Sequence, residues 1–251
     1  MTLGMRPCRR GAASIAHYRQ LSRMGSLCWD LRWFSVCSST EILLGEWLQH
    51  TPSIHYPRAV VARRQLRGVG QRGRAWLAPA GGVWMSAALP ATELSGAGRL
   101  GLAVALALSQ RLERQGVPVR IKWPNDLLVH GRKLAGVLPK LVHRGEQLRL
   151  VRCGIGLNVC NQVPSGAVAL QELLPHASPD VWVAEVLLAL EACQDWLRGS
   201  ADWLHQVEER MWAEQIADPA GGEPWGIAGL SSQGGLRLRR GAERVEWIRW
   251  P

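Results

Sequence analysis

Two lysines, an acid and an amide lie close together in one short stretch, residues 121–138, which reads IKWPNDLLVHGRKLAGVL. Pro124 disfavours a helix at the residue before it, so the polar residues that follow are expected where an extended segment ends. The His-Gly pair further on predicts a tight turn between two apolar runs. The resulting hairpin would bring Lys133 back towards Asp126.

This composition suits the handling of an anionic, phosphorylated substrate, because ammonium and amide groups beside apolar strands can hold phosphate oxygens. The alternative for each residue alone is simpler: Lys133 is solvated and Asp126 caps a turn. The combination favours the first interpretation, since the alternative must explain each polar residue separately.

A second stretch, residues 63–76, reads RRQLRGVGQRGRAW and contains three glycines and five arginines but no acid. Glycines free the backbone to expose successive N–H groups, and arginines add positive charge, which is how a loop cradles phosphates. It is not a P-loop, because the GKS or GKT ending is missing. The alternatives are a flexible basic surface loop and a nucleic-acid patch.

Composition and charge limit the classes of protein to which the chain can belong. Its 251 residues can hold one sizeable core and a small second domain. The formal net charge of +10 suggests anionic partners such as nucleotides, nucleic acid or acidic protein surfaces. The six cysteines show no CxxC and no zinc spacing, and HExxH is absent, so we expect reduced thiols and no metal held by protein side chains. The longest apolar window, residues 100–108, is far shorter than the ~20 residues of a membrane helix, so we expect a soluble, cytoplasmic protein.

The hydrophobic pattern predicts a mixture of helices and strands. Ser38 and Glu41 form a capping box that would start a helix. Another helix should begin at Thr92 or Ser95 and end at Gly116. Further helices are expected at residues 178–199 and 202–213, and strands at residues 59–62, 83–89, 136–142, 148–153, 225–230, 236–239 and 245–250.

We expect three segments along the chain. Residues 1–27 are a basic N-terminal extension, for which a disordered tail, an upstream start and an organelle transit peptide are the alternatives. The extension is too short for a helix-turn-helix domain with its own core, so DNA binding is not expected. Residues 28–216 should form the large catalytic domain, and residues 217–251 a small C-terminal β domain.

KWPNDL followed by GRKLAG, in residues 121–138, resembles the signature of the bacterial-type biotin protein ligases. In that family, biotin is joined to a lysine of a carrier domain through a biotinyl-adenylate. Residues 63–76 are similar to the family's GRGRRGRxW adenylate-binding loop, although Val69 and Gln71 stand where many members have arginines. GIGLN at residues 154–158 looks like the family's GxGxN segment near the nucleotide.

The resemblance implies a fold, an activity and partners. The fold would be α+β, a class II synthetase-like mixed sheet with helices mainly on one face, followed by a small abbreviated SH3-like β domain. The activity would be that of a biotin–[biotin carboxyl-carrier protein] ligase, which uses biotin and ATP as substrates with Mg²⁺. Its partner would be the biotin carboxyl carrier protein of acetyl-CoA carboxylase, with no N-terminal DNA-binding domain, no DNA and no membrane, and a homodimer is left open.

The resemblance also implies roles for individual residues. Lys133 would sit between the biotin carboxylate and the α-phosphate, Asp126 would orient the carrier lysine or accept its proton, and Arg72 would hold phosphates. The predicted biotin site contains Ser39, Thr40, Glu41, Gln65, Gly68, Val69, Gly70, Gln71, Lys133 and Gly136. The predicted nucleotide site contains Arg72, Arg74, Trp76, Lys122, Asn125 and Asn158. Glu41 departs from the family's Ser-Thr-Asn triplet, in which an asparagine follows the serine and threonine.

Three alternatives to this reading differ in what they explain. A lipoate ligase shares the fold and the adenylate chemistry, although KWPND favours biotin. A nucleic-acid-binding module would explain the positive charge but not the lysine hairpin. A relative that binds biotin without catalysis would explain the departures at Glu41, Val69 and Gln71.

Overall fold

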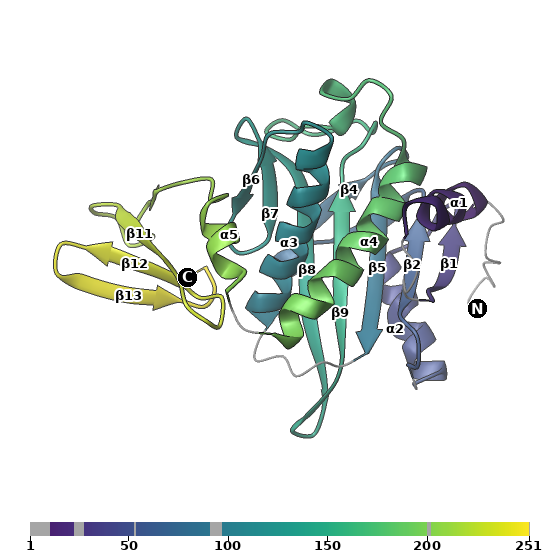
Figure 1. The fold of residues 1–251 in the computed structure, drawn as a ribbon, viewed down its shortest axis with the longest axis horizontal. Coiled ribbons are helices and arrows are strands. Elements are labelled where there is room, and N and C mark those ends of the chain that lie inside the picture. Colours follow the sequence, from purple (N-terminus) through teal and green to yellow (C-terminus); the bar gives the residue numbers. More distant parts are fainter. Residues whose placement is uncertain (1–10, 23–27, 53, 91–96, 200–201, 251) are drawn as a thin grey trace.

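A computed structural model describes residues 11–22, 28–52, 54–90, 97–199 and 202–250 of the chain. Its largest element is a sheet of seven strands in the order β1-β2-β5-β9-β8-β7-β6 (Figure 1). β1 runs parallel to β2, and the other neighbouring pairs in this sheet are antiparallel. The strands span Asp30–Phe34 (β1), Arg58–Ala62 (β2), Val83–Pro90 (β5), Val119–Lys122 (β6), Asp126–Val129 (β7), Arg132–Arg144 (β8) and Gln147–Leu157 (β9).

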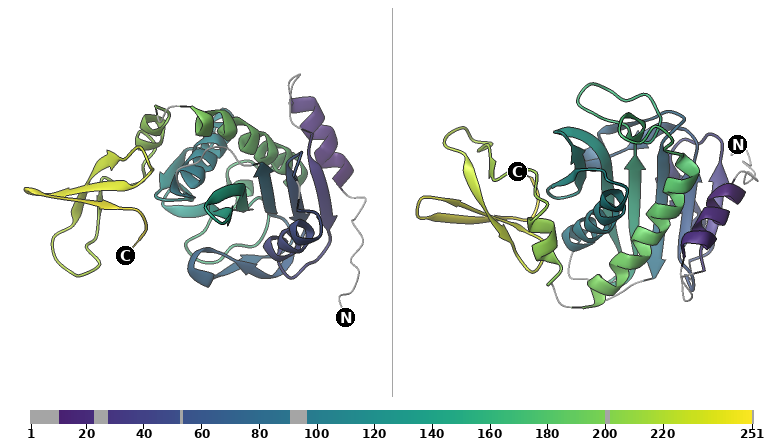
Figure 2. Two further views of the ribbon diagram at one scale, coloured as in Figure 1. Left: turned by 90° about the horizontal axis from the view of Figure 1, so that it is seen from below. Right: turned by 45° about the horizontal axis from the view of Figure 1, so that its top comes forward.

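Helices cover the two faces of this sheet unequally. α3 (Ala97–Arg114) and α4 (Pro179–Arg198) lie across one face, and α1 (Ala12–Leu21) packs beside α4. α2 (Thr40–His50) lies on the opposite face, as the left view of Figure 2 shows. This arrangement confirms the predicted α+β fold, in which a mixed sheet carries helices mainly on one face.

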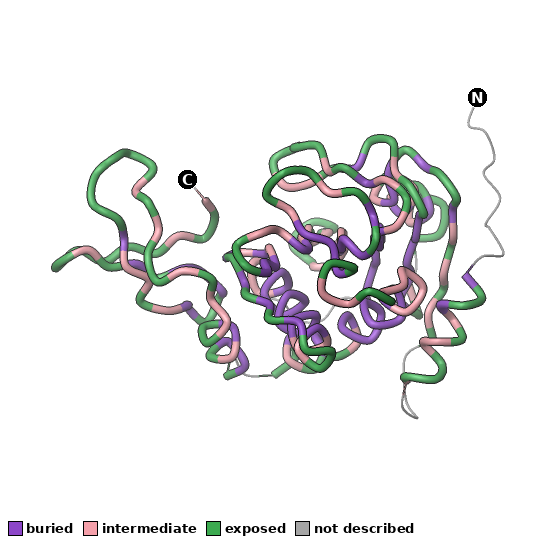
Figure 3. Tube along the Cα trace, turned by 90° about the horizontal axis from the view of Figure 1, so that it is seen from above, coloured by how far each residue is buried: buried purple, intermediate pink, exposed green. Residues whose placement is uncertain are grey.

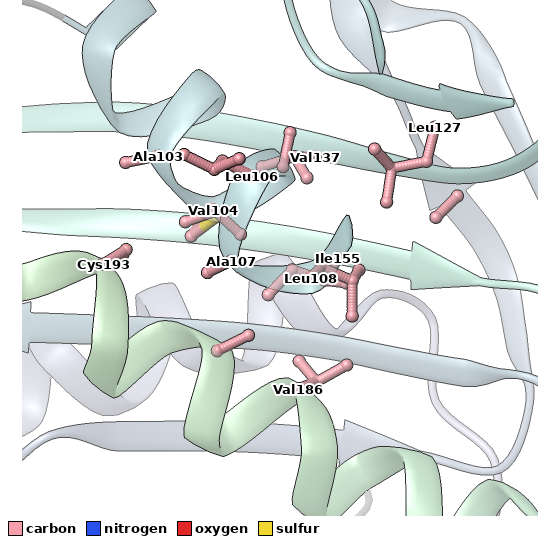
Figure 4. Packing of buried hydrophobic residues seen from close by; sticks show 14 of the residues in the cluster. Ala103, Val104, Leu106, Ala107, Leu108, Leu127, Val137, Ile155, Val186 and Cys193 are labelled. Atoms are coloured by element: carbon pink, nitrogen blue, oxygen red, sulfur yellow. The ribbon is translucent and has the colours of Figure 1, made fainter. Parts of the chain in front are cut away.

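Alternation along the strands divides the hydrophobic core between the two faces. Met85 and Ala87 of β5 belong to the large cluster under α3 and α4, whereas Ala88 joins a smaller cluster with Leu44 of α2. Figure 4 shows side chains from α3, α4 and the strands meeting in the large cluster. Because successive residues of a strand point to opposite sides, one face can be all core while part of the other serves a site.

The middle of α3 is buried on every side, from Leu100 to Ser109, because the sheet lies under it and α4 packs along it. This explains its near-continuous run of alanine and leucine, which is more apolar than a helix with one solvated face needs. The predicted start of this helix at Thr92 or Ser95 lies outside the described residues. None of the helices in the described ranges is both long and apolar enough to cross a membrane.

The predicted lysine hairpin is present. His130 (φ 47°) and Gly131 (φ 75°) both adopt left-handed backbone conformations in the two-residue turn between β7 and β8. A turn of this kind matches the twist of the flanking strands and fixes their register. The register places Lys133 opposite Leu128, so the lysine returns to the neighbourhood of Asp126.

Part of the predicted N-terminal extension is a helix rather than a disordered tail. Ser14 Oγ of α1 donates a hydrogen bond to Asp180 Oδ1 of α4 (2.8 Å), and Tyr18 donates to Glu191 of the same helix. These partners lie 166 and 173 residues away in the sequence, so the local pattern of α1 shows weak periodicity and no sign of them. Residues 1–10 and 23–27 of the extension lie outside the described residues.

The helix predicted at residues 202–213 is much shorter, since α5 covers only Leu204–Glu208. Beyond it the chain lies along β6, where Ile121 N donates to Arg210 O (2.7 Å) and Trp212 N donates to Ile121 O (2.9 Å). Backbone groups that bond to a strand are not available to a helix, so the helix ends.

The predicted capping box at the start of α2 is also absent. Ser39, one residue after the predicted Ser38, is the N-cap, and its hydroxyl accepts a hydrogen bond from Glu41 N (3.3 Å). The side chain of Glu41 is therefore not needed by the helix backbone, and it reaches elsewhere.

A four-stranded antiparallel sheet follows the main body, as predicted for the C-terminal region. Its strands are β10 (Gln215–Ile216), β11 (Trp225–Leu230), β12 (Leu236–Arg240) and β13 (Glu243–Trp247). Figure 3 shows that exposed and half-buried residues predominate in this small sheet, and none of the residues of β13 is buried. A hydrogen bond from Trp123 Nε1 to Gly234 O (2.9 Å) ties its β11–β12 turn to the main body.

Candidate active site

A cavity of about 520 Å³ lies on the face of the main sheet that carries α2. It is lined by the first residues of α2, the loop between β3 (Gln65–Val69) and β4 (Ala75–Ala78), parts of β5 to β9, and the tail after β13. Segments that are far apart in the sequence therefore share one hollow, of the size that small-molecule sites usually have.

Most of the predicted site residues meet around this cavity. Those that line it are Ser39, Thr40, Glu41, Gln65, Val69, Gly70, Gln71, Arg72, Arg74, Trp76, Lys122, Asn125, Asp126, Lys133 and Gly136. Their shared location is an observation, whereas their individual roles remain predictions.

The lysine hairpin supplies an ion pair at the cavity. Lys133 Nζ lies 2.7 Å from Asp126 Oδ2 and 5.0 Å from the centre of the Trp76 ring. The backbone of Lys133 is fixed on both sides, because its N–H donates to Gly166 O (2.9 Å) and its carbonyl accepts from Val168 N (3.0 Å). The amine is thus held at one place in the wall, with about a third of the side chain still exposed.

Hydroxyl and amide groups gather at the start of α2. Gln65 Oε1 accepts hydrogen bonds from Thr40 N (2.7 Å) and Thr40 Oγ1 (3.1 Å). Thr40 Oγ1 also lies 2.9 Å from Ser86 Oγ on β5. Donors and acceptors in this network are held by one another, which suits recognition of a polar, uncharged group by geometry.

The loop between β3 and β4, residues 70–74, closes one side of the cavity and is called the arginine loop below. Gly70 N donates to Arg74 O (2.8 Å), and Arg72 (φ 57°) and Gly73 (φ 72°) take left-handed backbone conformations that turn the chain. Arg72 donates a hydrogen bond to the carbonyl of Trp250. Arg72 and Arg74 therefore line the cavity, and the hydrogen bond between Gly70 and Arg74 joins the two ends of their loop.

The indole of Trp76 fits over two glycines of the sheet. A Cβ atom on Gly156 would come within 2.5 Å of the indole, and one on Gly136 within 3.1 Å. A side chain at either position would displace the ring, so these glycines make room for Trp76 between the loop and the sheet. The predicted role of Gly136 in contacting biotin is compatible with this, since it also lines the cavity.

Two predicted residues do not line the cavity but support it. Gly68 lies against the backbone of Trp76, where a Cβ would come within 2.5 Å of the carbonyl oxygen. Asn158 is buried, and its amide donates to Lys133 O (3.4 Å) while its oxygen accepts from Asn161 Nδ2 (3.0 Å). Through the first contact it supports the strand that carries Lys133, and its predicted contact with the adenylate stays a prediction.

Trp250 also lines the cavity, and the sequence did not predict this. Its indole meets Trp123 edge to face (centroids 5.7 Å apart), and its Nε1 donates to Trp123 O (3.2 Å). Trp250 follows the last strand of the small sheet, with no local motif around it. The sequence contains 13 tryptophans against 2 tyrosines and 1 phenylalanine, an unusual content that singles out no position.

The charges at the cavity favour an anionic ligand. Among the described lining residues, Arg72, Arg74, Lys122 and Lys133 are cationic, while Glu41 and Asp126 are acidic. Both carboxylates are paired, Asp126 with Lys133 (2.7 Å) and Glu41 with Arg152 (2.8 Å). The described residues contain no group of three or more His, Cys, Asp or Glu side chains that could hold a metal ion.

Comparison with known proteins places the chain in a family. Residues 33–158 match the biotin/lipoate A/B protein ligase family, which is half of the chain. The chain belongs to this family. The matched range includes every predicted site residue, whereas Trp250 lies outside it.

Individual relatives agree with this family assignment. The chain is 36% identical over 148 residues to the biotin–[acetyl-CoA-carboxylase] ligase of Paracoccus denitrificans, and 41% identical over 109 residues to the bifunctional ligase/repressor BirA of Bacillus subtilis. It spans 60% and 33% of the lengths of these two proteins, and 57% and 42% of its own length is matched. A biotin protein ligase from Aquifex aeolicus, solved in complex with biotin and ATP, is 27% identical with a TM-score of 0.75, over 88% of this chain and 96% of that chain.

The segment of residues 166–172, which follows β9, bonds to the backbone of Lys133, and an ion pair holds this segment in place. Arg132 Nη2 lies 2.8 Å from Glu172 Oε2, and Ala169 N donates to Glu172 Oε1 (3.3 Å). The hydrogen bond from Arg132 and then that from Ala169 hold the pKa of Glu172 below its ordinary value of 4.5. Arg132 directly precedes Lys133, so this contact fastens the segment next to the lysine.

The depressed pKa of Glu172 predicts a pH dependence of stability. The folded state binds this proton less tightly than the unfolded state, so the contact stabilises the fold above the ordinary carboxyl pKa and is lost as pH falls through the folded value. We expect the difference in unfolding free energy between wild type and Glu172→Gln to be constant near neutral pH and to shrink below pH 4.5. Urea denaturation at a series of pH values measures it, with the exposed Glu146→Gln as control. A difference that grew on acidification would contradict the assignment.

Proposed function

We propose that this protein activates biotin with ATP as biotinyl-5'-AMP and transfers the biotinyl group to a lysine of a biotin carboxyl carrier domain. The observation that carries the proposal is the meeting of the lysine hairpin, the arginine loop and the hydroxyl network around one cavity of about 520 Å³. The Aquifex aeolicus relative, whose structure is titled as a complex with biotin and ATP, supports the same pair of substrates.

The cavity offers different chemistry at its different sides. The network of Thr40, Gln65 and Ser86 can hydrogen-bond a ring that carries both N–H donors and a carbonyl acceptor, as the ureido ring of biotin does. Lys133 and the arginine loop can attract the carboxylate of biotin and the phosphates of ATP. A ligand that is polar at one end and anionic at the other fits this division.

In the first step, a carboxylate oxygen of biotin attacks the α-phosphorus of ATP and pyrophosphate leaves. Both reactants are anions, so much of the barrier comes from bringing negative charges together. Lys133 is placed to sit between the carboxylate and the α-phosphate, with Arg72 and Arg74 on the phosphates. Mg²⁺ would arrive with ATP and neutralise charge on its phosphates, since the protein's own carboxylates at the cavity are already paired.

In the second step, the amine of the carrier lysine attacks the carbonyl carbon of the mixed anhydride, and AMP leaves. A free lysine has a pKa of ~10.4 and is mostly protonated near neutral pH, so it must lose a proton before it attacks. Asp126 is our choice to orient this amine or to accept its proton. The carboxylate of Asp126 lies in the cavity wall, paired with Lys133. It would become available to the carrier amine when the intermediate attracts Lys133 away from it.

The proposal is tested by incubating the protein with biotin, MgATP and a biotin carrier domain and weighing the carrier. We expect a mass increase of one biotinyl group, which requires ATP and the carrier lysine. Lipoate in place of biotin provides the comparison, because a lipoate ligase of the same family would load lipoate instead. Binding of biotin with no pyrophosphate release and no carrier modification would indicate a non-catalytic relative and contradict the proposal.

We place the reaction in the cytoplasm, where the five described cysteines would stay free thiols, as they are in the structure.

Removing the Lys133 amine from the cavity wall should abolish most of the rate of adenylate formation, the first step. We expect Lys133→Ala to lower the rate of biotin-dependent pyrophosphate release by about 10²-fold to 10³-fold, the usual loss for one transition-state contact. Lys140→Ala, an exposed lysine on the same strand, is the matched control and should keep its activity. Circular dichroism checks that both variants fold. An undiminished rate in Lys133→Ala would rule out its assigned role.

The two positions that lack arginines should govern how long the intermediate stays bound. Val69 and Gln71 line the cavity, and charged hydrogen bonds from arginines there would hold the adenylate's phosphate. We expect the double variant Val69→Arg, Gln71→Arg to release biotinyl-AMP about tenfold more slowly than wild type. Rapid filtration of preformed adenylate measures the release rate, and Gln147→Arg, which adds charge at the exposed start of β9, is the control. Equal release rates for the double variant and wild type would refute the idea.

A further inference from the structure

Glu41 brings a carboxylate to the wall of a cavity that we assign to an anionic substrate, and Arg152 binds that carboxylate from outside the cavity. Arg152 Nη2 lies 2.8 Å from Glu41 Oε1, and the same nitrogen donates to the Glu41 carbonyl. Glu41 lines the cavity and Arg152 does not. One guanidinium thus binds both the side chain and the backbone of a single residue in the first turn of α2.

The chain makes space for this contact. Arg152 lies on β9, opposite Ala88 of β5, and its side chain runs under α2. Gly45, one turn along α2, allows the guanidinium to approach, because a Cβ there would come within 3.3 Å of Nη1. The side chain of Arg152 is 12% exposed and that of Glu41 24% exposed, so water screens the pair only weakly.

Within the described part of the chain, one atom of each partner in this pair lacks a hydrogen bond. Glu41 Oε2 and Arg152 Nε are both buried without a hydrogen-bond partner among the described residues. Breaking such a pair by removing one partner leaves an uncompensated charge in a poorly hydrated place, whereas neutralising both partners does not. The charge of Glu41 also affects Cys153 on β9. The pKa of Cys153 is raised by burial first, then by Cys193 and then by Glu41.

We propose that Arg152 is a positioning residue of the biotin site: it neutralises Glu41 and holds its carboxylate against β9. The first turn of α2 then presents the hydroxyls of Ser39 and Thr40 to the ligand instead of a free negative charge. Without Arg152, the carboxylate would turn into the cavity to find water and would repel both the ureido oxygen and the carboxylate of biotin. This inference rests on the proposed function, because it names biotin as the ligand that the neutralised wall accepts.

The test is a rescue experiment on biotin binding, measured by isothermal titration calorimetry. Arg152→Met should weaken biotin binding by about 30-fold or more, because it strands a buried carboxylate. Arg152→Met combined with Glu41→Gln should recover wild-type affinity to within about threefold, because no charge is left without a partner. Affinity for ATP alone should change by less than about threefold in both variants, which a general loosening of the fold would not permit.

A matched ion pair on the other face of the sheet serves as the control. Arg111 of α3 and Glu185 of α4 lie 2.6 Å apart, and their side chains are 17% and 9% exposed, against 12% and 24% for Arg152 and Glu41. Arg111→Met should cost a comparable amount of thermal stability and leave biotin affinity unchanged. Arg152→Met should therefore differ from it in ligand binding, at equal stability.

Each outcome decides the inference. Equal biotin affinity in Arg152→Met and Arg111→Met, or no recovery in the double variant, would overturn it while the wild-type reaction stands. If Arg152→Met cannot be purified folded, the double variant decides: folding with near-wild-type affinity supports charge neutralisation, and failure to fold overturns it. A wild-type protein that binds no biotin would overturn the proposed function first, and this inference with it.

Discussion

Joining two anions requires positive charge that is already in place, and the ion pair of Lys133 with Asp126 is how this structure holds such a charge. An amine on a flexible stem would ordinarily be solvated and mobile. Here its backbone is bonded on both sides, and its Nζ lies 2.7 Å from a carboxylate and 5.0 Å from the Trp76 ring. The carboxylate thus holds the amine at the cavity.

The two-sided character of the main sheet gives this ion pair its setting. Under α3 and α4 the sheet is a continuous hydrophobic core, which makes the strands rigid. On the other face, Gly136 and Gly156 leave space for the Trp76 ring, and α2 and the arginine loop form walls of the cavity. Rigid strands with a hollow above them are a good base for placing charged groups accurately, because their backbone positions vary little.

Charge balance at the cavity is the second feature on which the site depends. The two acids that line it are engaged, so the cations of the arginine loop and Lys122 set the sign of the field. A site that attracts anions can tolerate carboxylates of its own when each has a partner. The tail after β13 adds a further constraint, because Trp250 contacts both Trp123 and Arg72 and so connects the small sheet to the arginine loop.

Local patterns were enough to predict the lysine hairpin and the arginine loop, and the family resemblance that these stretches carry implied the α+β fold and most of the residues that line the cavity. These features depend on neighbours within a few residues, such as a His-Gly turn that reverses the chain or glycines that free a loop, so their signals are visible in short windows. Arg152, Trp250 and the supporting position of Asn158 could not be predicted in this way. Each acquires its meaning from a partner more than 20 residues distant, such as Glu41 for Arg152 (111 residues) and Trp123 for Trp250 (127 residues). Helix α1, whose partners on α4 are 166 and 173 residues away, belongs with them, because only the packed chain brings such groups within reach of one another.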